Sequence, residues 1–185
     1  MANEINAKKL MINTSNCLYT SQFCEENIWH LCQQICADGN FTQSEVIFLS
    51  NTNKQIAVYS QQAVPAHQAI IWDYHVILKT NYQNKTVIFD FDSRLSFPCL
   101  INDYLSNSLP AHIPSQFKTQ FRHISAELYL THFFSDRSHM INLIDKTKFP
   151  PYAPILSNHK NNLKLLHLID FNRPIQGTRI SNNLI

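Results

Sequence analysis

Four short runs of β-forming residues lie so close together that they restrict the fold more than any other feature of the sequence. These runs are Glu45–Leu49, Gln55–Ser60, Ile70–Thr80 and Lys85–Asp92. Two parallel strands need a crossover of a dozen or more residues, whereas antiparallel strands can be joined by a tight turn. The short gaps between the runs therefore predict a mostly antiparallel sheet.

An amphipathic helix is predicted directly before these strands. From a start near Cys24 or Glu25, apolar residues recur at helical spacing: Ile28, Leu31, Cys32, Ile35 and Cys36. Gly39 ends the pattern, and Thr20 and Ser21 are the candidate caps at its start. The chain is therefore expected to enter the sheet directly from a helix.

The second half of the chain predicts further helices and one late strand. Helical patterns cover Leu100–Leu109 and Ala126–Phe134, an extended piece lies near Phe121–Ile124, and Thr178–Ile180 has the pattern of a strand. Together these elements predict an α+β fold. The 185 residues suit one domain, so we expect residues 1–185 to form a single unit, with the N-terminal ~15 residues and the C-terminal tail loosely ordered.

Composition and charge exclude several classes of protein. Hydrophobic residues make up 44% of the chain and charged residues 15%, which indicates a globular protein rather than a disordered or coiled-coil one. The net charge is +2 and the basic residues are not clustered, so we expect no nucleic-acid partner. No apolar run reaches the roughly 20 residues of a membrane span. Met1–Leu10 lacks the apolar core of a signal peptide, so a cytoplasmic location is expected.

The five cysteines match neither a disulfide framework nor a zinc ribbon. They are Cys17, Cys24, Cys32, Cys36 and Cys99, and no two form a C-x-x-C pair. Cys32 and Cys36 could bind a metal together with His30, but both continue the apolar stripe of the helix and are interpreted as core residues. We therefore expect free thiols in a reducing compartment and no metal.

Cys24 is a candidate nucleophile because it stands at the predicted helix start. It precedes Ile28 by four residues and so points toward the sheet. The N–H groups of a first helical turn favour the thiolate, which predicts a lowered thiol pKa, and they could also hold an oxyanion. The alternative is an inert core cysteine. Cys17 lies upstream of the helix and has no such support.

A hairpin supplies a partner for this thiol. If residues 81–84 form its loop, Thr80 faces Lys85 and His75 comes opposite Asp90, with Asp92 one diagonal further away. A register shift of two residues would exchange the two aspartates. A histidine oriented by a carboxylate is what a cysteine nucleophile requires. The alternative is an ordinary cross-strand ion pair.

Five segments between Cys17 and Tyr152 carry a family resemblance. They are YTSQFCEEN at 19–27, WDYHV at 72–76, FDFD at 89–92, FPCL at 97–100 and SDRSHM at 135–140. In this order they resemble the protein N-terminal glutamine amidohydrolase family. The resemblance implies a papain/transglutaminase-like α/β/α sandwich whose mostly antiparallel central sheet is flanked by helices. It also implies a catalytic triad of Cys24, His75 and Asp90, with no cofactor and no metal.

The same resemblance implies a reaction and its partners. The substrates would be proteins or peptides with a free N-terminal glutamine, deamidated to glutamate with release of ammonia, a step that in eukaryotic cells feeds the arginine branch of the N-degron pathway. No membrane or nucleic-acid partner is implied, and a monomer is the working expectation. Two alternatives remain open: a deamidase or transglutaminase-like enzyme acting on internal glutamines, and a catalytically silent module that binds N-terminal residues.

Three residues are candidates for binding the substrate. A free α-ammonium group is best accepted by a carboxylate. Asp73 would share a strand face with His75, roughly 6.5–7 Å along the strand, although it could equally serve a neighbouring loop. Glu25, next to Cys24, is its rival, and Ser21 is a third candidate.

Three other side chains are weighed as neighbours of the site. His139 could border it, although a polar loop built by Asp136 and Arg137 is the preferred interpretation. Trp72 and Tyr74 alternate away from His75 and are expected to pack in the core.

Overall fold

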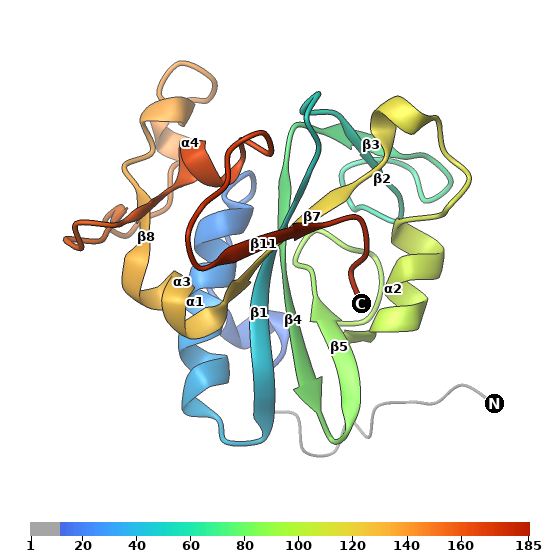
Figure 1. Ribbon diagram of the computed structural model, residues 1–185, viewed down its shortest axis with the longest axis horizontal. Coiled ribbons are helices and arrows are strands. Elements are labelled where there is room, and N and C mark those ends of the chain that lie inside the picture. Colours follow the sequence, from blue (N-terminus) through green and yellow to red (C-terminus); the bar gives the residue numbers. More distant parts are fainter. Residues whose placement is uncertain (1–11) are drawn as a thin grey trace.

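A six-stranded sheet forms the centre of the computed structural model, which describes residues 12–185 (Figure 1). Its strands are β1 (Phe41–Ser50), β4 (His75–Tyr82), β5 (Lys85–Phe89), β6 (Cys99–Leu100), β7 (Gln120–Ser125) and β11 (Thr178–Ser181). They lie in the order β11-β7-β1-β4-β5-β6, and every neighbouring pair is antiparallel. The predicted antiparallel sheet is confirmed. The interpretation of Met1–Leu10 falls outside the described residues, as does most of the N-terminal segment expected to be loosely ordered.

Two smaller sheets complete the strand pairing. β2 (Ile56–Val58) and β3 (Ile70–Trp72) form an antiparallel pair. β8 (Phe133–Ser135) pairs antiparallel with β9 (Ile155–Leu156) and parallel with β10 (Leu163–Lys164). The parallel ladder involves only two residues of each strand, so the α+β character of the fold is unchanged.

Helices cover both faces of the central sheet (Figure 1). α1 (Cys24–Ala37), α3 (Ala126–His132) and α4 (Leu165–Leu168) pack on one face, and α2 (Ile101–Ser108) packs on the other. Single 3-10 turns occur at Thr14–Asn16, Ser115–Phe117, Ser138–Met140 and Lys146–Lys148.

The two faces of the sheet follow from the alternation of side chains along its strands. In β1, Val46 and Phe48 belong to the core beside α1, whereas Ile47 and Leu49 belong to the core beside α2. Both sets are fully buried, so β1 is apolar on both faces over this stretch. Among residues 12–185, no helix has the length and apolar character to cross a membrane.

The start of α1 is held differently from the sequence prediction. Its N-cap residue is Phe23, which has no side-chain cap hydrogen bond, so Thr20 and Ser21 are not the caps. Instead, Asn27, one turn inside the helix, accepts from the backbone N–H of Thr20 and donates to its carbonyl oxygen, at 2.8 and 2.9 Å. This pair of bonds fixes the segment that leads to Cys24.

The hairpin between β4 and β5 is two residues tighter than predicted. Tyr82 pairs with Lys85, and the loop is only Gln83 and Asn84, both with positive φ. Two successive residues of positive φ make a type I′ turn, which suits the twist of a hairpin. The predicted pairing of Thr80 with Lys85 is therefore wrong, because Thr80 faces Val87.

The predicted strand Ile70–Thr80 is broken in the middle. β3 ends at Trp72 and β4 begins at His75, and the two strands belong to different sheets. At the break, the carboxylate of Asp73 accepts from the N–H of Tyr74, and its carbonyl oxygen accepts from the hydroxyl of Ser50. Asp73 therefore lies outside both strands and does not share a strand face with His75.

The C-terminal segment is tied to the sheet by a buried arginine. β11 pairs along β7, which confirms the late strand, and Leu184 beyond it is buried. The guanidinium of Arg122, in β7, donates to the carbonyl oxygens of Leu168, Asp170 and Arg173. One buried side chain thus anchors the loop between α4 and β11.

Candidate active site

Cys24 is the first residue of α1, as the sequence predicts, and its sulfur faces the start of β4. The backbone N–H of Val76, the residue directly after His75, lies close enough to the sulfur to favour its thiolate form. The thiol also lies 3.7 Å from Oε2 of Glu25, to which it donates. The thiol at the helix start therefore lies between the backbone at the start of β4 and the side chain of Glu25.

The predicted lowering of the Cys24 pKa is wrong. Although part of the residue reaches solvent, burial of the thiol raises its pKa well above the usual range, and the charges of Glu25 and Asp92 raise it further. The Val76 N–H acts in the opposite direction but does not offset these effects. The sequence argument considered only the helix start and not the acids beside it. The free protein therefore holds a protonated thiol that needs a base.

His75 and Asp90 form a buried pair. His75 Nε2 lies 2.8 Å from Asp90 Oδ1, and the two side chains are 2% and 1% exposed. Burial alone would lower the pKa of His75, but the charge and hydrogen bond of Asp90 more than offset this and raise it. Burial alone would raise the pKa of Asp90, but the same pairing lowers it. Asp90 is therefore an ionised acceptor.

The contact between His75 and Asp90 is found even though the register that predicted it is wrong. The ladder between β4 and β5 ends at Leu78 and Phe89, so Asp90 follows the end of its strand. There the chain turns, and Oδ1 of Asp90 accepts from the N–H of Asp92 at 3.0 Å. This turn places Asp90 rather than Asp92 against the imidazole.

Two neutral side chains complete the surroundings of Asp90. Its Oδ2 accepts from the Nε2 of Gln61 and from the hydroxyl of Tyr104, both at 2.9 Å. The sequence interpretation missed both residues. Tyr104 lies on the buried face of α2, where a phenol needs a polar partner, and this was an available signal. Gln61 lies between β2 and β3, where it forms an isolated β-bridge with Ser93, and no sequence pattern singles it out.

The pair fixes the tautomer of the imidazole. An ionised carboxylate can only accept hydrogen bonds, so the Nε2 of His75 must carry the proton that it shares with Asp90. In the neutral ring the other nitrogen, Nδ1, is then the lone-pair acceptor. The imidazole is thus prepared to take a proton at Nδ1.

Trp72 and Tyr19 border this pair. The ring of Trp72 stacks on His75 with centroids 6.0 Å apart and planes at 13°, so the expectation that it packs away from His75 is wrong. The hydroxyl of Tyr19 donates to Asp92 at 2.7 Å, which engages the second aspartate from the segment before α1. Asp92 is half-buried and has no hydrogen bond to the imidazole among the described residues.

On the other side of Cys24, Glu25 is fully buried and only partly satisfied. Its Oε2 accepts from the Tyr74 hydroxyl at 3.1 Å, and Tyr74 itself is buried as predicted. Among residues 12–185, its Oε1 has no hydrogen-bond donor, and Nε2 of His139 lies 4.0 Å from it. Burial, with the charge of Glu26 adding to it, raises the pKa of Glu25 to about 7.

Glu26, the next residue, is fully paired. The Nε and Nη2 of Arg137 donate to its two carboxylate oxygens at 2.8 and 2.6 Å. The same guanidinium donates to the carbonyl oxygens of Tyr152 and Pro150. The preferred interpretation of Arg137 as part of a local polar loop with Asp136 is wrong, because Arg137 is buried against α1.

The other two candidate substrate residues are exposed. The Asp73 carboxylate is bonded to the Tyr74 N–H, and Asp73 acts on the pKa of His139 by its charge, so it lies near that ring. Ser21 is exposed in the turn before α1. The structure thus brings Glu25 into contact with Cys24 and leaves Asp73 and Ser21 at the surface.

Metal-ligand side chains also gather near the buried pair. In the part of the chain that the structure describes, residues 12–185, one group has donor atoms within 4.8 Å of one another: His75, Asp90 and Asp92. Two of its three members already bond to each other, so a cation would have to break that bond. Cys32 is buried and Cys36 is exposed, so these two thiols do not face a common site.

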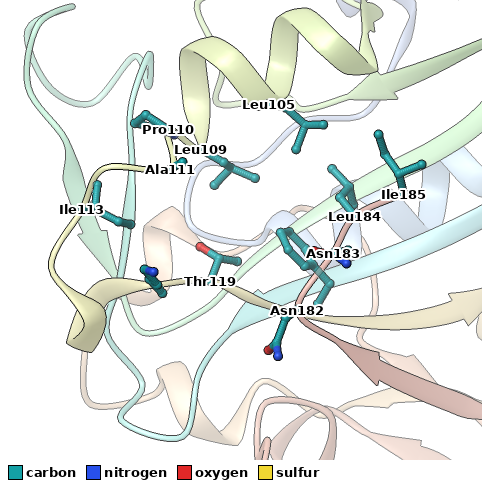
Figure 2. A pocket seen from close by; sticks show the side chains of 12 residues that line it. Leu105, Leu109, Pro110, Ala111, Ile113, Thr119, Asn182, Asn183, Leu184 and Ile185 are labelled. Carbon is teal, nitrogen blue, oxygen red and sulfur yellow. The ribbon is translucent and has the colours of Figure 1, made fainter.

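Two hollows in the surface differ in their relation to this site. One of about 650 Å³ is lined by Asp90 itself, next to Phe91. The other, of about 530 Å³, lies between α2 and the last residues of the chain, where Leu105, Ile113 and Leu184 line it (Figure 2). The second hollow contains none of the candidate site residues.

Comparison with known proteins gives one consistent answer. A family model described as N-terminal glutamine amidase matches residues 19–183. The chain is 40% identical over 140 residues to a Homo sapiens protein N-terminal glutamine amidohydrolase, covering 73% of this chain and 68% of that protein. Proteins of the same name from Danio rerio and Drosophila melanogaster are each 35% identical, over 82% and 78% of this chain and 78% and 74% of their own. The matched span includes the acidic, histidine and cysteine side chains described above.

Proposed function

This chain belongs to the N-terminal glutamine amidase family, and from that premise we propose that it hydrolyses the side-chain amide of an N-terminal glutamine to glutamate, releasing ammonia. Its substrates are proteins and peptides whose first residue is glutamine. We assign the reaction to Cys24, His75 and Asp90. The observation that supports this assignment is the buried, ionised Asp90 that orients His75, the residue directly before Val76, whose backbone acts on the thiol at the start of α1.

The proposed reaction begins with the removal of the thiol proton. The thiol of Cys24 gives its proton to Nδ1 of His75, and Asp90 stabilises the imidazolium that forms. The thiolate attacks the side-chain carbonyl carbon of the glutamine. Backbone N–H groups of the first turn of α1, which have no acceptor within the helix, stabilise the resulting oxyanion.

Collapse of this intermediate releases ammonia and regenerates the enzyme. The imidazolium of His75 protonates the departing amide nitrogen, the carbon–nitrogen bond breaks, and a thioester to Cys24 remains. A water molecule then gives a proton to His75 and attacks the thioester carbonyl. Breakdown of this second intermediate returns the proton to the sulfur and leaves an N-terminal glutamate. Asp90 holds the imidazole throughout both steps.

The arrangement also supports the finer expectations about fold and location. A nucleophile at a helix start, followed along the chain by a histidine on an antiparallel sheet and an aspartate at its edge, fits a papain/transglutaminase-like α/β/α sandwich. We propose that residues 1–185 act as one catalytic domain. We also propose that the enzyme is a monomer and acts in the cytoplasm, where reducing conditions keep thiols such as these described free cysteines reduced.

Mass spectrometry of a peptide set tests this function directly. The peptides begin with glutamine, acetyl-glutamine or asparagine, or carry glutamine at an internal position. We expect conversion of the amide to the acid only in the first peptide. Cys24→Ala should abolish it without loss of fold, since little buried volume is removed, and the matched variant Cys17→Ala should keep it.

Other outcomes would support the rival functions. Deamidation of the internal glutamine would indicate a deamidase or transglutaminase-like enzyme. Binding of the N-terminal peptide with no conversion by the wild type would indicate a silent recognition module. Loss of activity in Cys17→Ala with activity retained in Cys24→Ala would overturn the choice of nucleophile.

A further inference from the structure

Glu25 is the unexplained side chain of this site. It is 0% exposed, one of its oxygens has no donor among the described residues, and no arginine or lysine pairs with it as Arg137 pairs with Glu26. A buried carboxylate that is left unpaired costs free energy, and such groups in native proteins call for a reason. A ligand that carries a positive charge would supply the missing partner.

The open oxygen of Glu25 faces a second unpartnered atom. Nε2 of His139 is buried, lacks a hydrogen-bond partner among residues 12–185, and lies 4.0 Å from Oε1 of Glu25. Burial lowers the pKa of His139, so the ring is neutral at pH 7 and can accept a proton donor at one nitrogen. Two acceptors that share a tetrahedral ammonium at about 2.8 Å each stand about 4.6 Å apart. A widening of this gap by roughly 0.6 Å would therefore admit an ammonium nitrogen.

The distance to the nucleophile also fits a glutamine. Its α-nitrogen and its side-chain carbonyl carbon are separated by four bonds and so by at most about 5 Å. The thiol of Cys24 and Oε2 of Glu25 lie 3.7 Å apart, so both ends of one glutamine residue can be engaged from this corner of the site. An internal glutamine offers an amide instead of an ammonium, and a chain continuing through this buried position would have no room.

We propose that Glu25, assisted by His139, is the site that binds the α-ammonium group of the N-terminal glutamine. This proposal rests on the proposed function. It identifies the contact that would restrict the reaction to a glutamine at the N-terminus of a chain. The ion pair also removes the negative charge that disfavours the Cys24 thiolate, so a substrate with a free amino group helps to activate the nucleophile that attacks it. Asp73, exposed and bonded to its own loop, is not the acceptor.

Binding to an inactive enzyme tests the proposal without relying on turnover. In the Cys24→Ala background, calorimetry at pH 7.5 compares a glutamine peptide with its desamino analogue, in which hydrogen replaces the α-ammonium group. We expect the glutamine peptide to bind more tightly. Adding Glu25→Gln should weaken its binding about 10- to 100-fold and leave the analogue within a factor of about 2. Adding His139→Gln should weaken it about 3- to 10-fold.

The exposed acid nearby provides the matched control. Asp73→Asn in the same background should leave the preference for the ammonium group unchanged. An unchanged preference in the Glu25→Gln protein, or a preference lost in the Asp73→Asn protein, would overturn the proposal. If wild-type enzyme fails to deamidate the peptide while Glu25-dependent binding persists, the proposed function fails and the ammonium site stands.

A measurement on Cys24→Ala alone covers the case in which Glu25→Gln does not fold. The carboxylate must be ionised to bind the cation, and it is surrounded by Tyr74, Glu26 and His139. Affinity for the glutamine peptide should therefore rise between pH 6 and pH 7.5, whereas affinity for the desamino analogue should not. Parallel pH profiles for the two ligands would contradict the proposal.

Discussion

Two buried acidic side chains of the candidate site, Asp90 and Glu25, are held in opposite ways. Asp90 accepts from four groups, which are His75, Gln61, Tyr104 and the N–H of Asp92. Glu25 keeps one oxygen without a donor among residues 12–185. In the proposed mechanism Asp90 belongs to a catalytic group that is complete before substrate binds, since preorganised charge need not be rearranged during the reaction. In the proposed binding site Glu25 gains its counter-charge only from the substrate, whereas Glu26 beside it is already paired with Arg137.

The largest effect on activity should come from changing Asp90, the carboxylate whose hydrogen bonds are complete. Asp90→Asn puts a donor where His75 needs an ionised acceptor, so the useful tautomer and the imidazolium both lose their support. We expect kcat to fall about 10³- to 10⁴-fold. The preference for a free α-ammonium group should survive, because it belongs to the other carboxylate. Steady-state ammonia release on peptides, with circular dichroism for the fold, measures both, and a lost preference would contradict the separation of roles.

The next effect concerns stability. Glu26→Gln leaves the buried guanidinium of Arg137, 5% exposed, without its counter-charge. Removing one partner of a buried pair costs about 3–5 kcal/mol, and we expect a loss in that range in urea unfolding at pH 7. Glu127→Gln, an exposed change at the start of α3, is the control and should cost less than about 1 kcal/mol. Equal losses in the two variants would show that the Arg137 pair contributes little.

Glu25→Gln should do the reverse and stabilise the protein in alkaline solution. Because the pKa of Glu25 is raised to about 7 in the folded protein, from an ordinary value of 4.5, the folded state binds more protons between these two pH values. Unfolding free energy therefore falls as pH rises through that window, by about 3 kcal/mol for this group. Glutamine does not ionise, so the variant does not lose this free energy. In urea unfolding we expect its free energy of unfolding to exceed that of the wild type at pH 8 and to be similar to it at pH 4. A constant difference across pH would contradict the raised pKa.

The smallest effect tests the second aspartate. Asp92 is half-buried, and its carboxylate accepts from Tyr19 rather than from His75. Asp92→Asn keeps an acceptor for that hydroxyl, so we expect kcat to fall less than about 10-fold. A loss as large as that of Asp90→Asn, measured on the same peptide, would mean that the two aspartates share the support of the imidazole.

Local sequence patterns were enough to predict most elements but not how they join. The apolar spacing after Cys24 predicted α1, and the closely spaced β-forming runs predicted the antiparallel sheet. The predicted hairpin register was wrong because Gln83 and Asn84 both adopt positive φ and form a two-residue turn. Glycine, the usual sequence signal of such a turn, is absent from these two positions. The contact of His75 with Asp90 was predicted correctly from this incorrect register, because the chain turns where β5 ends.

The features of the site that could not be predicted from the sequence depend on contacts between segments that are distant along the chain. The thiol pKa was predicted in the wrong direction because the helix start was considered without Glu25 and Asp92. His139 reaches Glu25 only because Arg137, two residues earlier, is bound to Glu26. Such an arrangement depends on the packing of a whole loop against α1, and no local spacing predicts it.

The bond between Arg137 and Glu26 also bears on the order of events during synthesis. It joins residues 111 positions apart, and contacts of such separation form only after a large loop has closed. A growing chain thus exposes Cys24, His75 and Asp90 well before the guanidinium that neutralises Glu26 is made. Until then Glu26, which becomes fully buried, has no counter-charge, so the start of α1 cannot adopt its final packing. The geometry around Cys24 is therefore completed only after most of the domain has been made.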